Sequence, residues 1–414
     1  MLMLGCLLVL GGTALPRIYV SIGMIMLVLP CFFLQPFGNG IKKYWQDGFS
    51  LSIGLLFLLP FISGIYSTDL KDWSKVCQIK LPLLLLPFAA LGWPEILGKY
   101  VKAIQSFFVL ALFMACCWSI AQYMAHASEI ADGYLRAKVI PVPMGNSHVW
   151  FSYMVVVGVL FLIATWPKNP LNRALHVAGI IFFSLFLHLL AAKTGLIFLY
   201  CSLLVIGLRQ LFIRQKKWIA ALAIVTVIAL PFLAMQVFPT FKNRVQYMLY
   251  DFGNVANGKY EVGSNDGNRV VSLMAGWDIV KQDPVLGIGY GDVKPTVENW
   301  YTTNRPQTPP EEFTPPSNNW LLMWCGIGIA AIGVLAFLFF QLFKNNPNKT
   351  DLTWWLLCGM AFLSTLYENP FESQYGVYAF LVPFLIWRKL ITPSSGNGLN
   401  TFFARKDRNT DDMD

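Results

Sequence analysis

Apolar segments separated by short polar connections recur along almost the whole chain of 414 residues. A helix needs about 20 mostly apolar residues to cross roughly 30 Å of hydrocarbon, and somewhat fewer when flanking side chains reach the interface. Measured in this way, the sequence predicts about twelve membrane-spanning helices. The predicted spans are 1–15, 18–36, 49–66, 76–94, 103–125, 148–166, 174–192, 195–212, 218–237, 318–343, 353–367 and 375–391. The pattern therefore predicts an all-α polytopic membrane protein.

One long polar interval, from Phe238 to Ser317, interrupts this pattern between the ninth and tenth predicted spans. Inside it, apolar residues recur at the spacing of one helical face: Val270, Leu273, Met274, Trp277 and Val280. This spacing predicts an amphipathic helix with Arg269 in its first turn, on or just above a membrane surface. The residues that follow predict a tight loop, which we expect to let this helix fold back over a site: Pro284, Gly287, Gly289 and Gly291.

The chain accordingly divides into four parts. Residues 1–237 form spans one to nine, 238–317 an outer segment with the amphipathic helix, and 318–391 spans ten to twelve. Residues 392–414 are rich in Ser, Gly and Asn and then charged, without an apolar period, so we expect a disordered cytoplasmic tail. The segment 1–15 has no basic stretch before it, and we interpret it as the first span rather than a signal peptide.

Composition and charge support the membrane assignment and set its orientation. The mean hydropathy is +0.54 and only 13% of the residues are charged. Basic residues such as Lys42, Lys43 and Arg173 gather in the even-numbered connections, so the net charge of +9 is typical of the positive-inside rule rather than of nucleic-acid binding. Both termini are then cytoplasmic, and 238–317 lies on the far side of the membrane, which is the periplasm if the cell is a bacterium with an inner (plasma) and an outer membrane. The eight cysteines lack metal-type spacing, and we expect neither a metal nor a cofactor.

Ionisable residues at the outer ends of predicted spans are candidates for function. Lys193 precedes Thr194-Gly195 at such an end, and Lys80 lies near another; the alternative for both is a lysine that reaches the lipid headgroups. His148 opens the sixth predicted span, where an interfacial structural role is the alternative. Two carboxylates, Glu368 and Glu372, lie between the last two spans; we expect them to pair with Arg269 or Lys193, or one of them to accept a proton.

Several of these motifs occur together in one known family. The chain combines Lys193-Thr194-Gly195, Arg269 with Trp277, Pro284 with three spaced glycines, and Ser317-Asn318 at the start of the tenth span. In this order they resemble the O-antigen ligase and polymerase superfamily. The segments around Lys80, His148 and Glu368 resemble its Bacteroidetes-type branch.

The resemblance implies a fold like that of the C-type glycosyltransferases and a metal-independent reaction on polyprenyl-diphosphate-linked glycans. It implies that Lys193 and Arg269 bind the donor diphosphate, and fixed cations suit a leaving group that gains negative charge. Many relatives have a histidine where this chain has Ser317, and serine is no general base at neutral pH. The base is then His148 or Glu368, or the oxygens of the diphosphate suffice.

The resemblance favours an O-antigen ligase, which transfers a polysaccharide from undecaprenyl diphosphate to lipid A-core, among membrane lipids. The alternatives are a repeat-unit polymerase, which more often has two sizeable outer loops, a protein O-oligosaccharyltransferase and, from another class, a transporter. The predicted catalytic residues are Arg269, Lys193, His148 and Glu368. The predicted substrate-binding residues are Arg244, Arg305, Lys80, Trp277, Gly287, Gly289, Gly291, Ser317 and Asn318.

Overall fold

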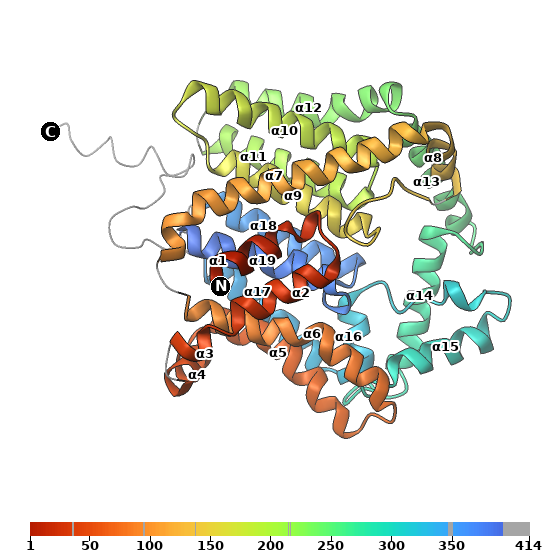
Figure 1. The fold of residues 1–414 in the computed structure, drawn as a ribbon. Coiled ribbons are helices and arrows are strands. Elements are labelled where there is room, and N and C mark those ends of the chain that lie inside the picture. The colour runs from red at the N-terminus through yellow and green to blue at the C-terminus, as the bar shows by residue number, and fades with distance from the viewer. Residues whose placement is uncertain are drawn as a thin grey trace.

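The computed structural model describes residues 1–34, 37–93, 96–136, 138–213, 215, 217–346 and 351–391. All regular secondary structure among these residues is helical, which confirms the all-α class (Figure 1). The predicted tail, 392–414, lies outside the described residues.

Every predicted span coincides with helical structure. The helices are α1 (Leu2–Leu10), α2 (Arg17–Val28), α5 (Gly48–Ile62), α6 (Leu70–Leu91), α7 (Ile96–Ala125), α9 (His148–Ala164), α10 (Pro170–Leu190), α11 (Lys193–Phe212), α12 (Lys217–Val237), α16 (Asn319–Ile327), α17 (Ala330–Lys344), α18 (Leu352–Tyr367) and α19 (Gln374–Ile391). Six helices in the described part of the chain are long and apolar enough to cross a membrane alone, or seven if one bent pair counts as a span. The chain is thus a multi-pass membrane protein, and the count of about twelve stays a prediction.

The second predicted span, 18–36, is interrupted within the described residues. The helix α2 ends at Val28, and two further short helices, α3 (Cys31–Leu34) and α4 (Phe37–Gln46), follow it. A proline at position 30 lacks the N–H group that would continue the helical hydrogen bonds, so the helix stops before it.

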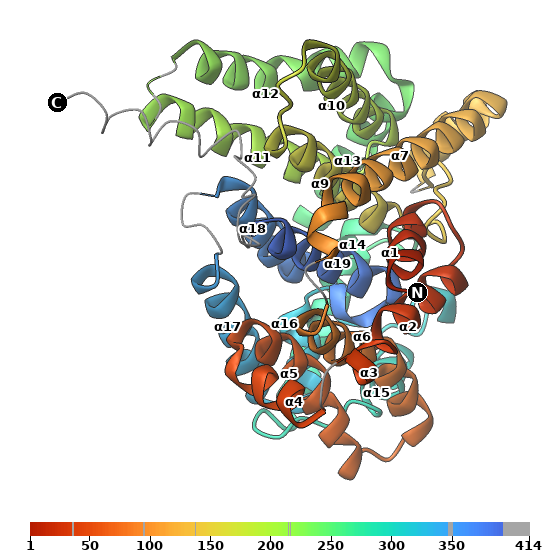
Figure 2. The ribbon, with the colours of Figure 1, turned by 60° about the vertical axis from the view of Figure 1, so that its left-hand side comes forward.

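The helix α9 lies at the centre of the bundle, and α12 lies at its edge (Figures 1 and 2). Nearly every side chain of α9 is buried, and it packs against α7, α10, α11, α18 and α19. By contrast, the buried residues of α12 are only Ala220 and Ala234 among those described. Many of its other apolar side chains are exposed, as expected for a helix in contact with lipid, among them Leu222, Val225, Ile228 and Phe232.

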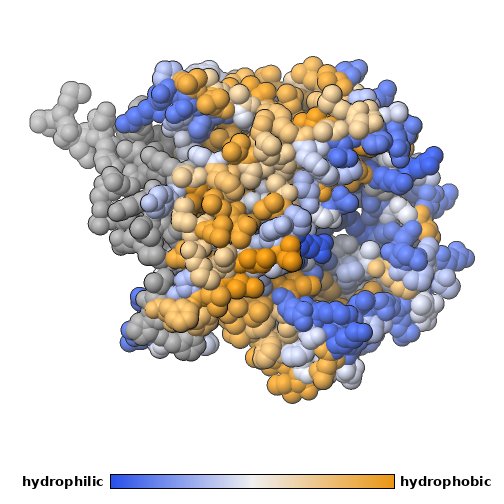
Figure 3. Space-filling view, viewed as in Figure 1, coloured by the Kyte–Doolittle hydropathy of each residue, from blue (hydrophilic) through white to orange (hydrophobic). Residues whose placement is uncertain are grey.

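The outer segment 238–317 folds into helices of its own, α13 (Pro239–Ala256), α14 (Asn265–Val280) and α15 (Val293–Asn304). Together with α8 (Ala127–Gly133) they lie at one end of the bundle, which we call the loop face (Figure 1). Hydrophilic atoms gather at this end and the surface is hollowed beside α14, whereas apolar atoms cover much of the bundle in the same view (Figure 3).

The tenth predicted span, 318–343, is broken rather than continuous. Gly328 separates α16 from α17 with φ 62° and ψ −154°, a conformation that only glycine adopts readily. Residues 283–291, which we call the glycine loop, fill the break. The N–H groups of Ile288 and Gly289 donate to the carbonyls of Cys325 and Gly326 at 2.9 and 3.1 Å, and Ile329 N–H donates to Val285 O at 3.2 Å.

This contact changes the role expected for the glycines. Gly287 and Gly289 have positive φ angles, and a Cβ on Gly287 would lie 2.5 Å from the Gly328 nitrogen. The loop therefore supplies hydrogen-bond partners to backbone groups that the break in the helix leaves unpaired. Unpaired backbone groups are costly within a membrane. The loop joins the end of α14 to the break between α16 and α17, and the predicted turn that lets α14 fold back over a site stays a prediction.

Replacing Gly328 tests the importance of this junction. A Cβ on Gly328 would lie 2.0 Å from Val285 O, so Gly328→Ala should lower the free energy of unfolding by about 2 kcal/mol or more. The matched control is Gly333→Ala in α17, where a Cβ meets nothing within 4 Å and alanine favours the helix. Thermal unfolding in detergent measures both, and equal midpoints would show that the junction tolerates a side chain.

Candidate functional site

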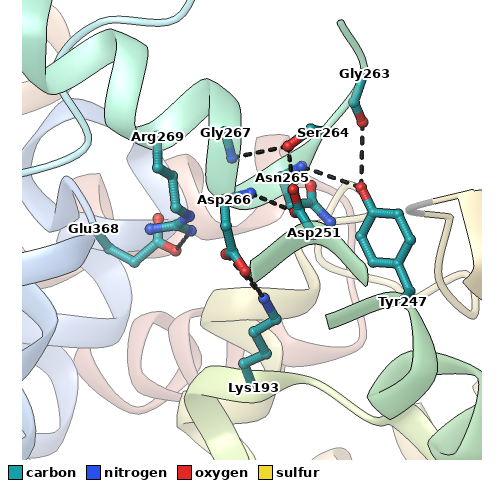
Figure 4. Close-up of polar contacts among 10 residues, drawn as sticks. All are labelled: Lys193, Tyr247, Asp251, Gly263, Ser264, Asn265, Asp266, Gly267, Arg269 and Glu368. Atoms are coloured by element: carbon teal, nitrogen blue, oxygen red, sulfur yellow. Dashed lines mark hydrogen bonds and ion pairs between the residues drawn. The ribbon is translucent and has the colours of Figure 1, made fainter. Parts of the chain in front are cut away.

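The start of α14 is held by a buried carboxylate on α13 (Figure 4). Asp251 is 1% exposed, and its oxygens accept hydrogen bonds from the Ser264 hydroxyl and from the Asp266 N–H, the latter at 2.8 Å. Ser264 caps the helix by accepting from the Gly267 N–H at 2.8 Å. These groups satisfy N–H donors that lack a partner within the helix. They fix the direction in which the first turn of α14 projects its side chains.

Two ion pairs then join α14 to the ends of two bundle helices (Figure 4). Lys193, the first residue of α11, places its Nζ 2.9 and 2.8 Å from the two carboxylate oxygens of Asp266. One turn further along α14, Arg269 donates to the Glu368 carboxylate and to the Tyr367 carbonyl, where α18 ends. The sequence left Lys193 and Arg269 as possible partners of Glu368, and the structure pairs Glu368 with Arg269.

Both ion pairs are open to solvent. The side chains of Lys193 and Asp266 are 25% and 34% exposed, and those of Arg269 and Glu368 are 38% and 18% exposed. Exposed pairs contribute about 0–1 kcal/mol to stability, because water screens the charges. The two cations can therefore exchange their carboxylate partners for an anionic ligand at small cost.

A third cation, Arg244 on α13, stands beside these pairs without a partner. It is 6% exposed, and its Nε and Nη1 atoms have no hydrogen-bond partner among the described residues. Burial lowers the pKa of the guanidinium, and the charges of Asp266 and Arg269 act on it. A buried guanidinium without hydrogen bonds is costly, since water is lost and nothing replaces it. Such a group indicates a place for an anion that the described residues do not supply.

Arg244 is presented by one face of α13. Residues 244, 247 and 251 follow the spacing of three and four that places side chains on the same helical face. Tyr247 accepts from the Asn265 N–H at 3.2 Å, and the Arg244 guanidinium carbon lies 5.9 Å from the centre of its ring. The same face of α13 therefore positions both Arg244 and the first turn of α14.

His148 begins α9 at the loop face, after a turn in which Asn146 has a φ of 60°. It lies close enough to Arg244 and Arg269 for their positive charges to act on its imidazole. The structure thus brings His148 to the cluster of cations, while its predicted catalytic role stays a prediction.

Lys80 is separate from this cluster. Its side chain is 0% exposed, and Nζ lies 2.5 Å from a Glu372 oxygen and 3.0 Å from the Phe371 carbonyl. The Tyr290 hydroxyl, from the glycine loop, donates to the same Glu372 oxygen at 2.5 Å. Lys80 therefore ties the glycine loop to the segment that follows Glu368, and no exposed atom of Lys80 meets a ligand.

The remaining predicted residues take part in structural contacts. Ser317 N–H donates to the Ser272 hydroxyl at 3.1 Å, and Asn318 caps α16 by accepting from Leu321 N–H at 2.9 Å. Arg305 follows α15, with its guanidinium carbon 5.3 Å from the centre of the Tyr260 ring. A Cβ on Gly291, the last glycine of the loop, would lie 2.2 Å from Asp69 O. Trp277 is half-exposed and packs edge-on against Trp324.

The sequence pattern did not predict Asp266 as the partner of Lys193. Its only signal was its position one turn before Arg269, which places both side chains on one helical face. No group of three or more His, Cys, Asp or Glu side chains that could hold a metal ion occurs among the described residues.

Fold and site together define a polytopic helical membrane protein that gathers three cations beside two carboxylates on one face. Residues 177–338 match a family model described as O-antigen ligase. The chain is also 22% identical over 335 residues to the O-antigen ligase of Salmonella typhimurium. The aligned region covers 79% of this chain and 77% of that relative. Both matches support the O-antigen ligase superfamily, whose members are, in general terms, enzymes that transfer glycosyl groups. The Bacteroidetes-type branch stays a prediction.

The matched range contains Lys193, Arg244, Asp266 and Arg269, whereas His148 and Glu368 lie outside it. The cations of the cluster thus belong to the part of the chain that the family model describes.

Replacing Arg244 should separate stability from anion binding. Arg244→Met keeps much of the side-chain volume but removes the buried charge, so the free energy of unfolding should rise by about 1 kcal/mol. Affinity for inorganic diphosphate should fall at least tenfold, since a hydrogen bond to a charged group contributes about 1.5–3 kcal/mol. Thermal unfolding and calorimetric titration of the purified protein measure the two effects.

Lys242→Met, on the exposed side of α13, is the control for Arg244→Met and should change neither quantity. A loss of stability in Arg244→Met would show that the guanidinium has a structural partner.

Proposed function

We propose that this protein is an O-antigen ligase. It transfers a polysaccharide from undecaprenyl diphosphate to lipid A-core at the periplasmic face of the bacterial inner membrane, without a metal ion. The observation that carries the proposal is the buried, unpartnered Arg244 beside two cations in exposed ion pairs. The similarity to the O-antigen ligase superfamily supports it.

The charges of the cluster suit a diphosphate. Three cations, Lys193, Arg244 and Arg269, face two carboxylates, so one positive charge is left without a partner. In the proposed complex, Asp266 and Glu368 hold Lys193 and Arg269 in place until the diphosphate replaces them. Arg269 then offers a planar fork of donors to the phosphate oxygens, and Lys193 offers a point charge.

The proposed reaction is a displacement at the anomeric carbon of the donor. An acceptor hydroxyl forms the new glycosidic bond, the bond from that carbon to the diphosphate oxygen breaks, and the diphosphate leaves with the electron pair. Fixed cations lower the barrier because they meet charge that develops in the transition state. The acceptor proton passes to a base, and we assign this role to His148 because it lies beside Arg244 and Arg269.

Arg269→Ala tests the proposal in cells. In a strain that lacks the native gene, the wild-type chain should restore lipopolysaccharide carrying the polysaccharide, and Arg269→Ala should leave a bare core with polymer on undecaprenyl diphosphate. In-vitro transfer should fall at least a hundredfold, as for loss of one donor to a developing oxyanion. Lys281→Ala, at the exposed end of α14, should retain transfer at equal abundance.

The gel also separates the alternatives. A deletion strain whose core carries a single repeat unit would identify a polymerase, and normal lipopolysaccharide with altered glycoproteins would identify a protein O-oligosaccharyltransferase. Solute flux in liposomes without glycan transfer would identify a transporter. Normal transfer by Arg269→Ala would overturn the assignment of the site.

A second pair of variants tests the base. His148→Ala should reduce turnover about 10²–10⁴-fold with little change in the affinity for donor, because general-base catalysis contributes in this range. Glu368→Gln keeps hydrogen-bonding atoms but removes the charge that competes with the donor for Arg269, so it should retain turnover and bind donor more tightly. Turnover and the Michaelis constant for lipid-linked glycan measure both. Unchanged turnover in His148→Ala would leave the diphosphate oxygens as the base.

A further inference from the structure

The helix that carries Arg269 exposes apolar side chains directly after it. Leu273, Met274 and Trp277 are 37%, 38% and 51% exposed, whereas the opposite side of α14 is buried against α15 and α16. Leu273 and Trp277 follow Arg269 by four and eight residues, so all three lie on one helical face. This face changes from charged to apolar over about 12 Å of helix.

Three tryptophans form the walls of a groove at this place. The groove has a volume of about 430 Å³, and its lining residues are Leu273, Trp277, Asn318, Trp320, Leu321, Trp324 and Ile332. We call it the tryptophan groove. The rings of Trp277 and Trp324 meet edge to face, with their centres 6.1 Å apart.

The polar atoms of the wall are bonded to the protein. Trp320 Nε1 donates to Thr365 Oγ1 at 2.9 Å, and Trp324 Nε1 donates to Pro284 O at 2.8 Å. The indole rings of these two residues therefore offer apolar surface to whatever fills the groove. The bond to Pro284 also connects the wall to the glycine loop.

The groove is continuous with the cation cluster. Asn318, at its edge, donates from Nδ2 to the Leu366 carbonyl at 2.8 Å. The next two residues, Tyr367 and Glu368, are the ones that bind Arg269. On the other side, Ile332 belongs to α17, whose neighbour Ile329 is 52% exposed. A ligand in the groove would thus reach from Arg269 toward the apolar surface of the bundle.

We propose that the tryptophan groove holds the part of a polyprenyl chain that adjoins the diphosphate, with the diphosphate itself at Arg269. This inference rests on the proposed function. It follows from the order of the residues on one face of α14, where a cation is followed by an apolar surface. A lipid with an anionic head and an apolar chain needs both, in this order. A lipid anchored elsewhere has no need of an apolar groove that begins at Arg269.

The experiment compares ligands that share a head and differ in their chain. The purified full-length protein is titrated with inorganic diphosphate, farnesyl diphosphate and dodecyl diphosphate. The wild type should bind farnesyl diphosphate at least tenfold more tightly than inorganic diphosphate. The variant Leu273→Ser with Trp277→Ala should lose most of this gain, while its affinity for inorganic diphosphate stays within twofold of the wild type.

Trp218→Ala is the matched control, because Trp218 is 69% exposed at the start of α12 and does not line the groove. It should retain the full gain for farnesyl diphosphate. If Trp218→Ala lost the gain in affinity for farnesyl diphosphate, the gain would come from general contact with lipid or detergent, and the inference would be overturned.

The outcomes also separate this inference from the proposed function. If inorganic diphosphate does not bind, or binds equally to Arg269→Ala, the proposed anion site itself is wrong. If it binds but the farnesyl chain adds no affinity, or the groove variant keeps the gain, the groove assignment is overturned while the anion site stands. Equal affinity for dodecyl and farnesyl diphosphate would overturn the polyprenyl assignment in favour of a groove for any alkyl chain.

Discussion

The contact between the glycine loop and the break at Gly328 is the constraint on which the site depends. A membrane helix that breaks must have its backbone groups bonded by other parts of the protein, because lipid supplies no hydrogen bonds. Here the loop that follows α14 supplies them, at Cys325, Gly326 and Ile329. The C-terminal end of α14 is thereby fixed to the bundle, as Asp251 fixes its start. Arg269 lies between two fixed ends, so its position follows from backbone bonding rather than from its own ion pair.

Burial distinguishes the lysines that appear alike in the sequence. Lys80 is fully buried and paired with Glu372, and removing Glu372 would leave a buried ammonium group without its partner, which costs about 3–5 kcal/mol. Lys193 is paired in the open with Asp266, where the exchange of one anion for another costs little. The first lysine therefore serves to hold the glycine loop, and the second is free to serve a ligand. Their sequence contexts, each near the outer end of an apolar helix, are the same.

Hydropathy and charge were sufficient for the helical class and for the position of Lys193, because a charged residue at the end of an apolar span stands out. The amphipathic period placed Arg269 in the first turn of its helix. These patterns could not predict the break at Gly328, since residues 318–343 are apolar on both sides of it and the break lies in a backbone angle. Nor could they predict that Glu372 binds Lys80 while Glu368 binds Arg269. Glu368 and Glu372 are only four residues apart, so the sequence does not show which of them pairs with which cation. The packing of α6, which carries Lys80, decides this.

Arg244 lowers the stability of the protein in the absence of an anion. A buried guanidinium without hydrogen bonds destabilises the free protein, whereas the same group gains charge-assisted bonds when an anion enters. If the site binds the proposed diphosphate, this cost is met before binding, so the cations need not be gathered at the time of reaction. The two partly exposed carboxylates, Asp266 and Glu368, complement this arrangement, because they hold Lys193 and Arg269 in place. Order at the site is therefore maintained by interactions that a stronger anion can replace.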